Sequence, residues 1–217
     1  MMEHSSPEGL RSGDVIAQYT VESLLGQGGM AVVYKVRHNT LESHHAMKLL
    51  TVQGRSISQR LVQEGRVQAR LRHPNIVAVT DYVEHDGRPG LVMEYVDGPS
   101  LQEWLAKHGR PDPEVAEQWF RAVVGAVAHA HAQGLVHRDL KPGNVLLQPV
   151  GDELVPKVAD FGIAKVLVDD GVASAVSTRT GLPMGSPPYM APEQIRSAKD
   201  VDRRADVFSL GCILYEL

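Results

Sequence analysis

Two short segments, HRDLKPGN at residues 137–144 and DFG at 160–162, constrain this chain more than any other feature. Together they place two carboxylates, Asp139 and Asp160, and one amide, Asn144, in segments flanked by apolar residues. Phosphoryl transfer requires few reactive side chains, because the nucleotide carries the leaving group and the protein supplies position and charge neutralisation. The pattern therefore predicts that Asp139 accepts a proton from a hydroxyl group, while Asn144 and Asp160 hold magnesium ions.

The composition is that of an ordinary globular protein. The chain has 217 residues, a formal net charge of −4 and a single cysteine, Cys212. One cysteine excludes a disulfide framework and a four-cysteine zinc site, and we expect Cys212 to be a small buried hydrophobe. The charge pattern gives no sign of nucleic-acid binding. Residues 1–18 are mostly polar, carry Ser, Pro and Gly and lack an apolar signal segment, so we expect a flexible leader. The apolar stretches of the chain are shorter than the roughly 20 residues of a membrane span, so we expect no membrane segment and a cytoplasmic location.

Residues 19–96 favour short β-strands. One helical stretch, from Ser58 to Leu71, interrupts them. We therefore expect a mostly antiparallel sheet with one helix in this part of the chain. The strand-like runs are YTVESLL, AVVYKVRH, HAMKLL, IVAVTDYV and PGLVMEYV.

The rest of the chain has helical spacing up to Gly134. Ser100 and Glu103 form a capping box at the start of one helix. Asp112, followed by Pro113, begins a longer helix that ends near Gly134. The stretch of short strands and loops that follows is long enough to indicate a functional segment. Two aromatic residues on the helices are expected in the core: Trp104 and Trp119.

A glycine-rich segment, GQGGMAVV at 26–33, lies between two predicted strands. Glycine lets backbone N–H groups approach phosphates without obstruction by a Cβ atom. A dinucleotide-binding fold would require a helix directly after the glycines, but AVVYKV is strand-like, which argues against that fold. Lys48 is either an edge-strand lysine in solvent or a phosphate ligand, with Glu64 on the following helix as its carboxylate partner.

Two basic residues of the loop around Asp139, Lys141 and His137, have different expected roles. Lys141 is placed to neutralise the transferring phosphate. His137 is expected to be structural, because the apolar neighbours Leu135 and Leu140 indicate a packed loop. The chain's histidines lack the clustering that a zinc site requires.

Taken in order, these segments resemble the eukaryotic-type (Hanks-type) Ser/Thr protein kinase domain over residues 19–217, in its bacterial form. The resemblance implies an α+β, two-lobed protein kinase-like fold. It has a small β-rich N-lobe with one helix (19–96) and a mainly helical C-lobe (97–217). The signature blocks are LGQGGMAVV (25–33), AMK (46–48), Glu64, HPNIV (73–77), HRDLKPGN (137–144), DFG (160–162) and APE (191–193).

The resemblance also implies a role for each matching residue. Asp139 and Lys141 would be catalytic, and Asn144 and Asp160 would bind Mg²⁺ or Mn²⁺. Lys141 has the form typical of Ser/Thr specificity. The residues expected to contact ATP are Leu25, Gly26, Gln27, Gly28, Gly29, Met30, Ala31, Val32, Val33, Ala46, Lys48, Glu64, Met93, Glu94, Val96 and Leu146. Two scaffold residues are also implied: Glu193, which anchors the activation segment, and Asp206, which braces the catalytic loop.

Arg138 implies regulation by phosphorylation. An arginine beside the catalytic aspartate gains a charge-assisted partner when an activation-segment residue is phosphorylated, and Thr178 and Thr180 are the candidates. The partners implied are ATP and a protein substrate with Ser or Thr, together with a second copy of the chain for autophosphorylation. The expected function is transfer of the ATP γ-phosphate to Ser/Thr hydroxyls of proteins.

The family domain normally continues for several helices beyond the helix that contains ADVFSLGCILYEL, in or just after which this chain stops. The resemblance thus implies an incomplete C-lobe in which Leu210, Ile213, Leu214 and Leu217 lose neighbours. Each of these side chains that is left exposed would forfeit about 1.5–3 kcal/mol of burial energy, against a typical net stability of about 5–15 kcal/mol. An incomplete C-lobe leaves one alternative function, a catalytically impaired nucleotide-binding fragment or scaffolding module. A separate alternative is a small-molecule phosphotransferase on a related fold.

Overall fold

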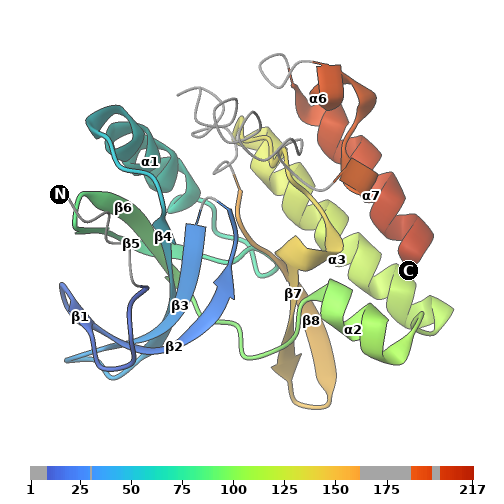
Figure 1. Cartoon of the computed structure of the whole chain (residues 1–217). Coiled ribbons are helices and arrows are strands. Elements are labelled where there is room, and N and C mark those ends of the chain that lie inside the picture. The colour runs from blue at the N-terminus through green and yellow to red at the C-terminus, as the bar shows by residue number, and fades with distance from the viewer. Residues whose placement is uncertain (1–8, 30, 162–186, 197–200) are drawn as a thin grey trace, which may run out of the picture. The chain divides into compact units, whose positions relative to one another are not determined.

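The computed structural model describes residues 9–29, 31–161, 187–196 and 201–217 (Figure 1). Contacts divide these residues into two compact units. The first unit contains the described residues up to Gly54 together with Thr80–Tyr95, and the second contains Arg55–Val79 and the described residues from Val96 onward. Each unit has a hydrophobic core of its own.

The first unit is a six-stranded sheet with the order β1-β2-β3-β4-β6-β5 (Figure 1). The neighbours from β1 to β4, and β4 with β6, pair antiparallel. A strand forms in every run that the sequence predicted, because β-branched and aromatic residues suit a pleated, half-buried surface. The strands are β1 (Val15–Ile16), β2 (Tyr19–Gln27), β3 (Ala31–His38), β4 (His44–Leu50), β5 (Val79–His85) and β6 (Arg88–Glu94).

The core of the first unit consists of alternate residues on its strands. Tyr34 and Val36 of β3 and Met47 of β4 are buried together. The sheet begins earlier than the sequence pattern indicated, since β1 lies within the expected leader. Ile16 is only 2% exposed and joins the same core, which explains why this part of the chain is ordered.

The second unit is mainly helical, with one β-hairpin. Strand β8 and helix α7 both pack against α3 (Figure 1). This combination confirms the predicted α+β class. The elements are α1 (Arg55–Gln68), α2 (Leu101–His108), α3 (Pro113–Ala132), the 3-10 turn η1 (Pro142–Asn144), β7 (Val145–Val150), β8 (Glu153–Val158), the 3-10 turn η2 (Pro187–Tyr189), α6 (Pro192–Arg196) and α7 (Arg203–Glu216).

Local signals determine the ends of α2 and α3. Ser100 Oγ accepts a hydrogen bond from the Glu103 N–H at 3.2 Å, and Glu103 Oε2 accepts one from the Ser100 N–H at 2.8 Å. The predicted capping box is therefore confirmed. Helix α3 begins at Pro113 as predicted, although the Asp112 side chain makes no capping hydrogen bond. Gly134 follows the helix with a φ of 76°, a conformation that favours glycine.

The core of the second unit is built on α3. Its buried residues include Trp119, which is 4% exposed, and Val123. The ring of Trp119 meets that of the half-buried Trp104 edge to face, with 5.0 Å between the ring centroids. Trp119 Nε1 donates a hydrogen bond to the Leu154 carbonyl at 2.9 Å. Trp119 therefore lies in the core, as predicted, and Trp104 packs against that core from a half-buried position.

Helix α7 corrects part of the prediction about its apolar residues. Leu210 and Ile213 are 8% and 0% exposed and belong to the core around α3. They are buried because they lie one turn apart on the side of α7 that packs on α3. Leu217 is partly buried against the same core. Leu214 alone of the four is exposed, at 52%.

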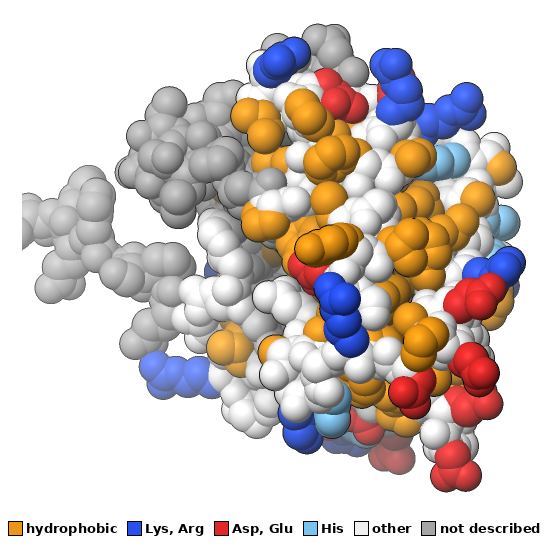
Figure 2. Space-filling model, turned by 90° about the vertical axis from the view of Figure 1, so that its right-hand side faces the viewer, with side chains coloured by type: hydrophobic (Ala, Val, Ile, Leu, Met, Phe, Trp, Pro, Cys, Tyr) orange, Lys and Arg blue, Asp and Glu red, His pale blue; other side chains and the backbone are white. Residues whose placement is uncertain are grey.

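The outer side of α7 is apolar and accessible. Val207, Phe208 and Tyr215 are exposed there, and Figure 2 shows hydrophobic side chains gathered on the side of the molecule that carries this helix. Cys212 is only partly buried, which corrects the expectation of a fully buried thiol. In the ranges that the structure describes, no helix combines the length and apolar character needed to cross a bilayer.

Candidate active site

Two side chains of the loop at 137–144 converge on Asp139. Lys141 Nζ lies 2.8 Å from Asp139 Oδ2, within an ion pair that is partly shielded from solvent. Asn144 Nδ2 donates to the Asp139 carbonyl at 2.7 Å and contacts Asp139 Oδ2 at 3.2 Å. The structure thus brings together the two residues predicted to be catalytic and one of the predicted metal ligands.

The β7–β8 hairpin explains how Asn144 and Asp160 come to lie at the same end of one element. Val145, the first residue of β7, pairs with Val158, the last residue of β8. The pairing continues one step further, since the Ala159 N–H donates to the Asn144 carbonyl at 2.9 Å. Asp160 follows with a left-handed φ of 65°, so its backbone turns away from the line of the strand.

The donor atoms at this end of the hairpin fit a hard divalent cation. Mg²⁺ prefers carboxylate and amide oxygens. Because Asn144 uses Nδ2 in both of its contacts with Asp139, its Oδ1 is the end of the amide that can act as a metal ligand. Asp160 supplies a half-buried carboxylate. This pair of donors suits Mg²⁺ or Mn²⁺ rather than a zinc ion.

A buried carboxylate braces the loop from α7. Asp206 is 0% exposed. Its Oδ2 accepts the His137 N–H at 2.8 Å, and its Oδ1 accepts the Arg138 N–H at 2.9 Å. These two residues directly precede Asp139, so the brace acts on the backbone next to that carboxylate. The implied bracing role of Asp206 agrees with these hydrogen bonds.

His137 is structural, as predicted. Its side chain is fully buried, and its Nε2 hydrogen-bonds to the Ala159 carbonyl at 2.8 Å. Its ring centroid lies 4.7 Å from that of Phe161, which is 2% exposed and belongs to the core. The His137 imidazole thereby connects the loop at 137–144 with residues 159–161.

Four residues predicted to contact ATP share one face of the first unit's sheet. Val33 pairs with Lys48, and Ala46 pairs with Met93. Directly paired residues project to the same face, and so do residues two apart on a strand, such as Ala46 and Lys48. Lys48 is half-buried and lies on β4 between β3 and β6, so it is not an edge-strand lysine.

The glycine-rich segment forms the end of the β2–β3 hairpin. Gly28 N–H donates to the Ala31 carbonyl at 2.9 Å. None of Gly26, Gly28 and Gly29 has a positive φ, and a Cβ atom at Gly26 or Gly29 would meet no described atom within 4 Å. The hairpin itself therefore does not require glycine at these positions.

The remaining predicted residues are distributed as follows. Some belong to strands of the first unit: Leu25 and Gln27 lie on β2, Val32 on β3 and Glu94 on β6. Three belong to the second unit: Glu64, Val96 and Leu146. Met30, Thr178 and Thr180 lie outside the described residues. The pairing of Lys48 with Glu64 stays a prediction.

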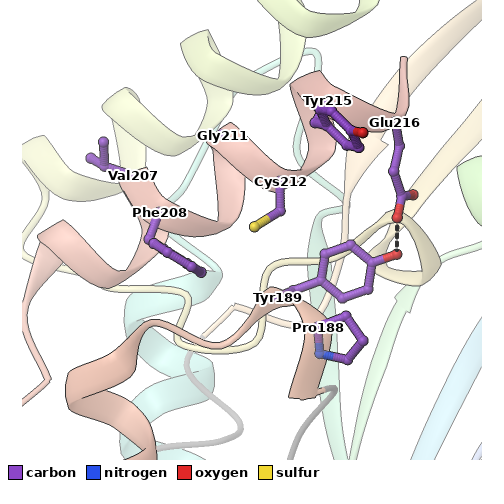
Figure 3. Close-up of a pocket in the computed structure, with 8 residues that line it drawn as sticks. All are labelled: Pro188, Tyr189, Val207, Phe208, Gly211, Cys212, Tyr215 and Glu216. Atoms are coloured by element: carbon purple, nitrogen blue, oxygen red, sulfur yellow. Dashed lines mark hydrogen bonds between the residues drawn. The ribbon is translucent and has the colours of Figure 1, made fainter.

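Sequence reasoning missed several contacts that hold the segment at 187–196. The Ser209 hydroxyl donates to the Tyr189 carbonyl at 2.8 Å. The Tyr189 hydroxyl donates to Glu216 Oε1 at 2.6 Å (Figure 3). Burial and the Glu216 carboxylate raise the pKa of Tyr189, which keeps its hydroxyl a donor. No motif in the sequence signals these pairings, because they join residues that are distant along the chain.

The same segment forms one wall of a groove against α7, as Figure 3 shows. The residues that line the groove are Pro188, Tyr189, Val207, Phe208, Gly211, Cys212, Tyr215 and Glu216. The lining is mostly apolar and contains neither Asp139 nor Asp160. The groove is therefore separate from the candidate catalytic residues.

Comparison with known proteins identifies the family. The model of the protein kinase domain matches residues 19–217, so the chain belongs to the protein kinase domain family. A crystal structure of Rad53 1-466 in complex with AMP-PNP has a TM-score of 0.71 and 28% sequence identity. The match covers 91% of this chain and 47% of that one. The kinase-like fold that the sequence motifs implied is thus confirmed.

Relatives with curated names are bacterial serine/threonine-protein kinases. The chain is 38% identical to pkn3 of Myxococcus xanthus, over 94% of this chain and 38% of that protein. It is 36% identical to PknL of Mycobacterium bovis, over 100% of this chain and 53% of the relative. It is 35% identical to PrkC of Bacillus subtilis, over 94% of this chain and 30% of the relative. The chain therefore spans about half of these proteins or less.

Proposed function

We propose that this chain is the catalytic part of a protein serine/threonine kinase. In the proposed reaction, Asp139 accepts the proton of a Ser or Thr hydroxyl as the oxygen attacks the γ-phosphorus of ATP. The bond between that phosphorus and the β,γ-bridging oxygen breaks, and ADP leaves. Lys141 neutralises the transferring phosphoryl group, since positioning and charge stabilisation supply most of the catalysis in this chemistry.

The observation that carries the proposal is the convergence of Lys141 and Asn144 on Asp139. A cation 2.8 Å from one carboxylate oxygen and an amide that holds the same residue fix the carboxylate in one orientation. A general base requires such fixed geometry before its pKa matters. The names of the relatives, all serine/threonine-protein kinases, support a hydroxyl on a protein as the acceptor.

The proposal assigns ATP to the face of the sheet that carries Lys48. Val33, Ala46 and Met93 would contact the adenine, and Lys48 would contact the α- and β-phosphates with Glu64 as its partner. The glycine positions of the β2–β3 hairpin support phosphate binding. The hairpin itself does not require glycine there. Close approach of a ligand to the backbone therefore explains why these positions carry glycine.

The proposal also includes a divalent metal. Asn144 Oδ1 and the Asp160 carboxylate would hold Mg²⁺ or Mn²⁺, which would neutralise charge on the ATP phosphates. We place the activity in the cytoplasm, where ATP is available as the phosphoryl donor. We also propose that a second copy of the chain is a substrate, through autophosphorylation.

Regulation by phosphorylation is the last part of the proposal. The Arg138 Nε is buried and has no hydrogen-bond partner among the described residues. A buried donor of this kind gains from a phosphate oxygen, because charge-assisted hydrogen bonds are about twice as strong as neutral ones. We propose phosphorylated Thr178 or Thr180 as that partner. Mass spectrometry of active protein in which neither residue is modified would contradict this assignment.

The acceptor class is tested with radiolabelled ATP. Purified protein is incubated with Mg²⁺, labelled ATP and either a protein acceptor or a panel of small hydroxyl compounds, and the labelled protein is hydrolysed to identify its phosphoamino acids. We expect label in phosphoserine and phosphothreonine of protein only. Label in a small molecule would favour a small-molecule phosphotransferase. ATP binding without any transfer would favour an impaired nucleotide-binding module.

A further inference from the structure

Arg138, the residue before the proposed catalytic base, has an unusual backbone. Its φ is 68°, in the left-handed region that side-chain-bearing residues rarely adopt. A residue in this region stays there only when surrounding contacts hold it. Because Asp139 follows directly, the conformation of Arg138 places the Asp139 backbone from which the carboxylate reaches Lys141.

Two side chains from different helices hold the two peptide groups of Arg138. On the N-terminal side, Asp206 of α7 accepts the Arg138 N–H at 2.9 Å. On the C-terminal side, Gln194 of α6 donates from Nε2 to the Arg138 carbonyl at 2.7 Å. That carbonyl belongs to the peptide that joins Arg138 to Asp139, and the N–H of the same peptide donates to His137 Nδ1 at 3.3 Å.

Gln194 is itself fixed in place. Its Oε1 accepts the Ala191 N–H at 3.1 Å, so both ends of the amide are in use. Ala191 is 0% exposed and packs with Val201 and Ala205. Gln194 therefore connects a buried turn next to α6 with the backbone of the catalytic loop. It lies 56 positions after Arg138 in the sequence.

We propose that Gln194 is a positioning residue for Asp139. By holding the carbonyl between Arg138 and Asp139, it couples the placement of the segment at 187–196 to the orientation of the base. A shift of that segment would release the carbonyl and let the strained Arg138 backbone relax. The inference rests on the proposed kinase function, since it assigns Gln194 a role in aiming the base of that reaction.

Gln194→Glu separates this role from packing. Glutamate has the same shape and keeps an oxygen for the Ala191 N–H, but its carboxylate cannot donate to the Arg138 carbonyl. We expect kcat to fall by about tenfold to a hundredfold, because small displacements of a reacting group cost that much. We expect the KM for ATP to change by less than about twofold. Gln194→Ala should give a similar loss.

The matched control is Gln118→Glu, at an exposed glutamine on α3, which should leave kcat unchanged.

A second readout is independent of activity. Hydrogen–deuterium exchange of a peptide spanning residues 135–141 should be faster in Gln194→Glu than in the unchanged protein, while exchange in the β2–β3 hairpin stays the same. Unchanged thermal midpoints would show that the fold is intact.

Several results would overturn the inference. One is a Gln194→Glu protein with kcat within about twofold of the unchanged protein. Another is exchange at 135–141 that does not respond to either substitution. An unchanged protein without phosphotransfer would contradict the proposed function instead, and the exchange measurement would still decide whether Gln194 holds the loop.

Discussion

His131 Nε2 lies 2.7 Å from Asp206 Oδ2, so helix α3 contacts the buried carboxylate that braces the catalytic loop. Asp206 is 0% exposed, and the His131 side chain is 14% exposed. The same carboxylate accepts the main-chain N–H groups of His137 and Arg138. Three partners from two parts of the unit thus satisfy one buried charge, which a low-dielectric interior requires.

Removing this carboxylate should destabilise the second unit. Asp206→Ala leaves the N–H groups of His137 and Arg138 without their acceptor, at about 1–3 kcal/mol for each group. We expect the free energy of unfolding to fall by about 2–6 kcal/mol in urea denaturation. Asp152→Ala, in the exposed turn between β7 and β8, is the control. A loss at Asp206 no larger than at Asp152 would contradict the bracing role.

Trp119 should contribute through its indole N–H as well as through its ring. Trp119→Phe keeps an aromatic ring beside Trp104 but leaves the Leu154 carbonyl without the donor now 2.9 Å away. We expect a loss of about 1–3 kcal/mol in the free energy of unfolding. Trp104→Phe, at a half-buried ring, should cost less. Equal losses at the two positions would show that the hydrogen bond adds little.

Stability should fall in mild acid because of the histidine pair His73 and His129. Their ring centroids are 5.3 Å apart, and burial, with a smaller effect of His129, lowers the pKa of His73. A lowered pKa means that the unfolded chain binds the proton more tightly. The stabilising effect is therefore present above the unfolded value of about 6.5 and is lost as pH falls through the lowered pKa.

His129→Phe tests this pair. The substitution removes the effect of His129 on the pKa of His73 and keeps an aromatic ring beside His73. The drop in thermal midpoint between about pH 7.5 and about pH 5.5 should become smaller but not vanish, since burial of His73 remains. If the drop is the same with and without His129, the two rings do not influence each other's protonation.

Local signals in the sequence predicted the ends of α2 and α3 well, whereas the helix expected at Ser58–Leu71 spans Arg55–Gln68. Ser100 and Glu103 form their capping box because the interaction involves only neighbouring residues. The strands of the first unit follow from their β-branched runs, and the motif order gave the family. These features depend on short-range chemistry, which a single sequence displays directly.

Features that depend on packing between distant segments were not predictable in this way. Ile213 was expected to lose packing neighbours but is fully buried against the core around α3. Cys212, its neighbour, was expected to be buried and is half-exposed. Which side of α7 faces inward is set by α3, not by α7 itself. The hydrogen bond from Gln194 to Arg138 likewise has no local signature.

The most direct test of the central claim is the rate of γ-phosphate transfer to a protein acceptor by Asp139→Asn. Asparagine preserves the shape but cannot accept the hydroxyl proton as a carboxylate does, so kcat should fall at least about a hundredfold. Asp152→Asn, in the exposed turn between β7 and β8, should match the unchanged protein. A rate for Asp139→Asn within about twofold of the unchanged protein would contradict Asp139 as the base.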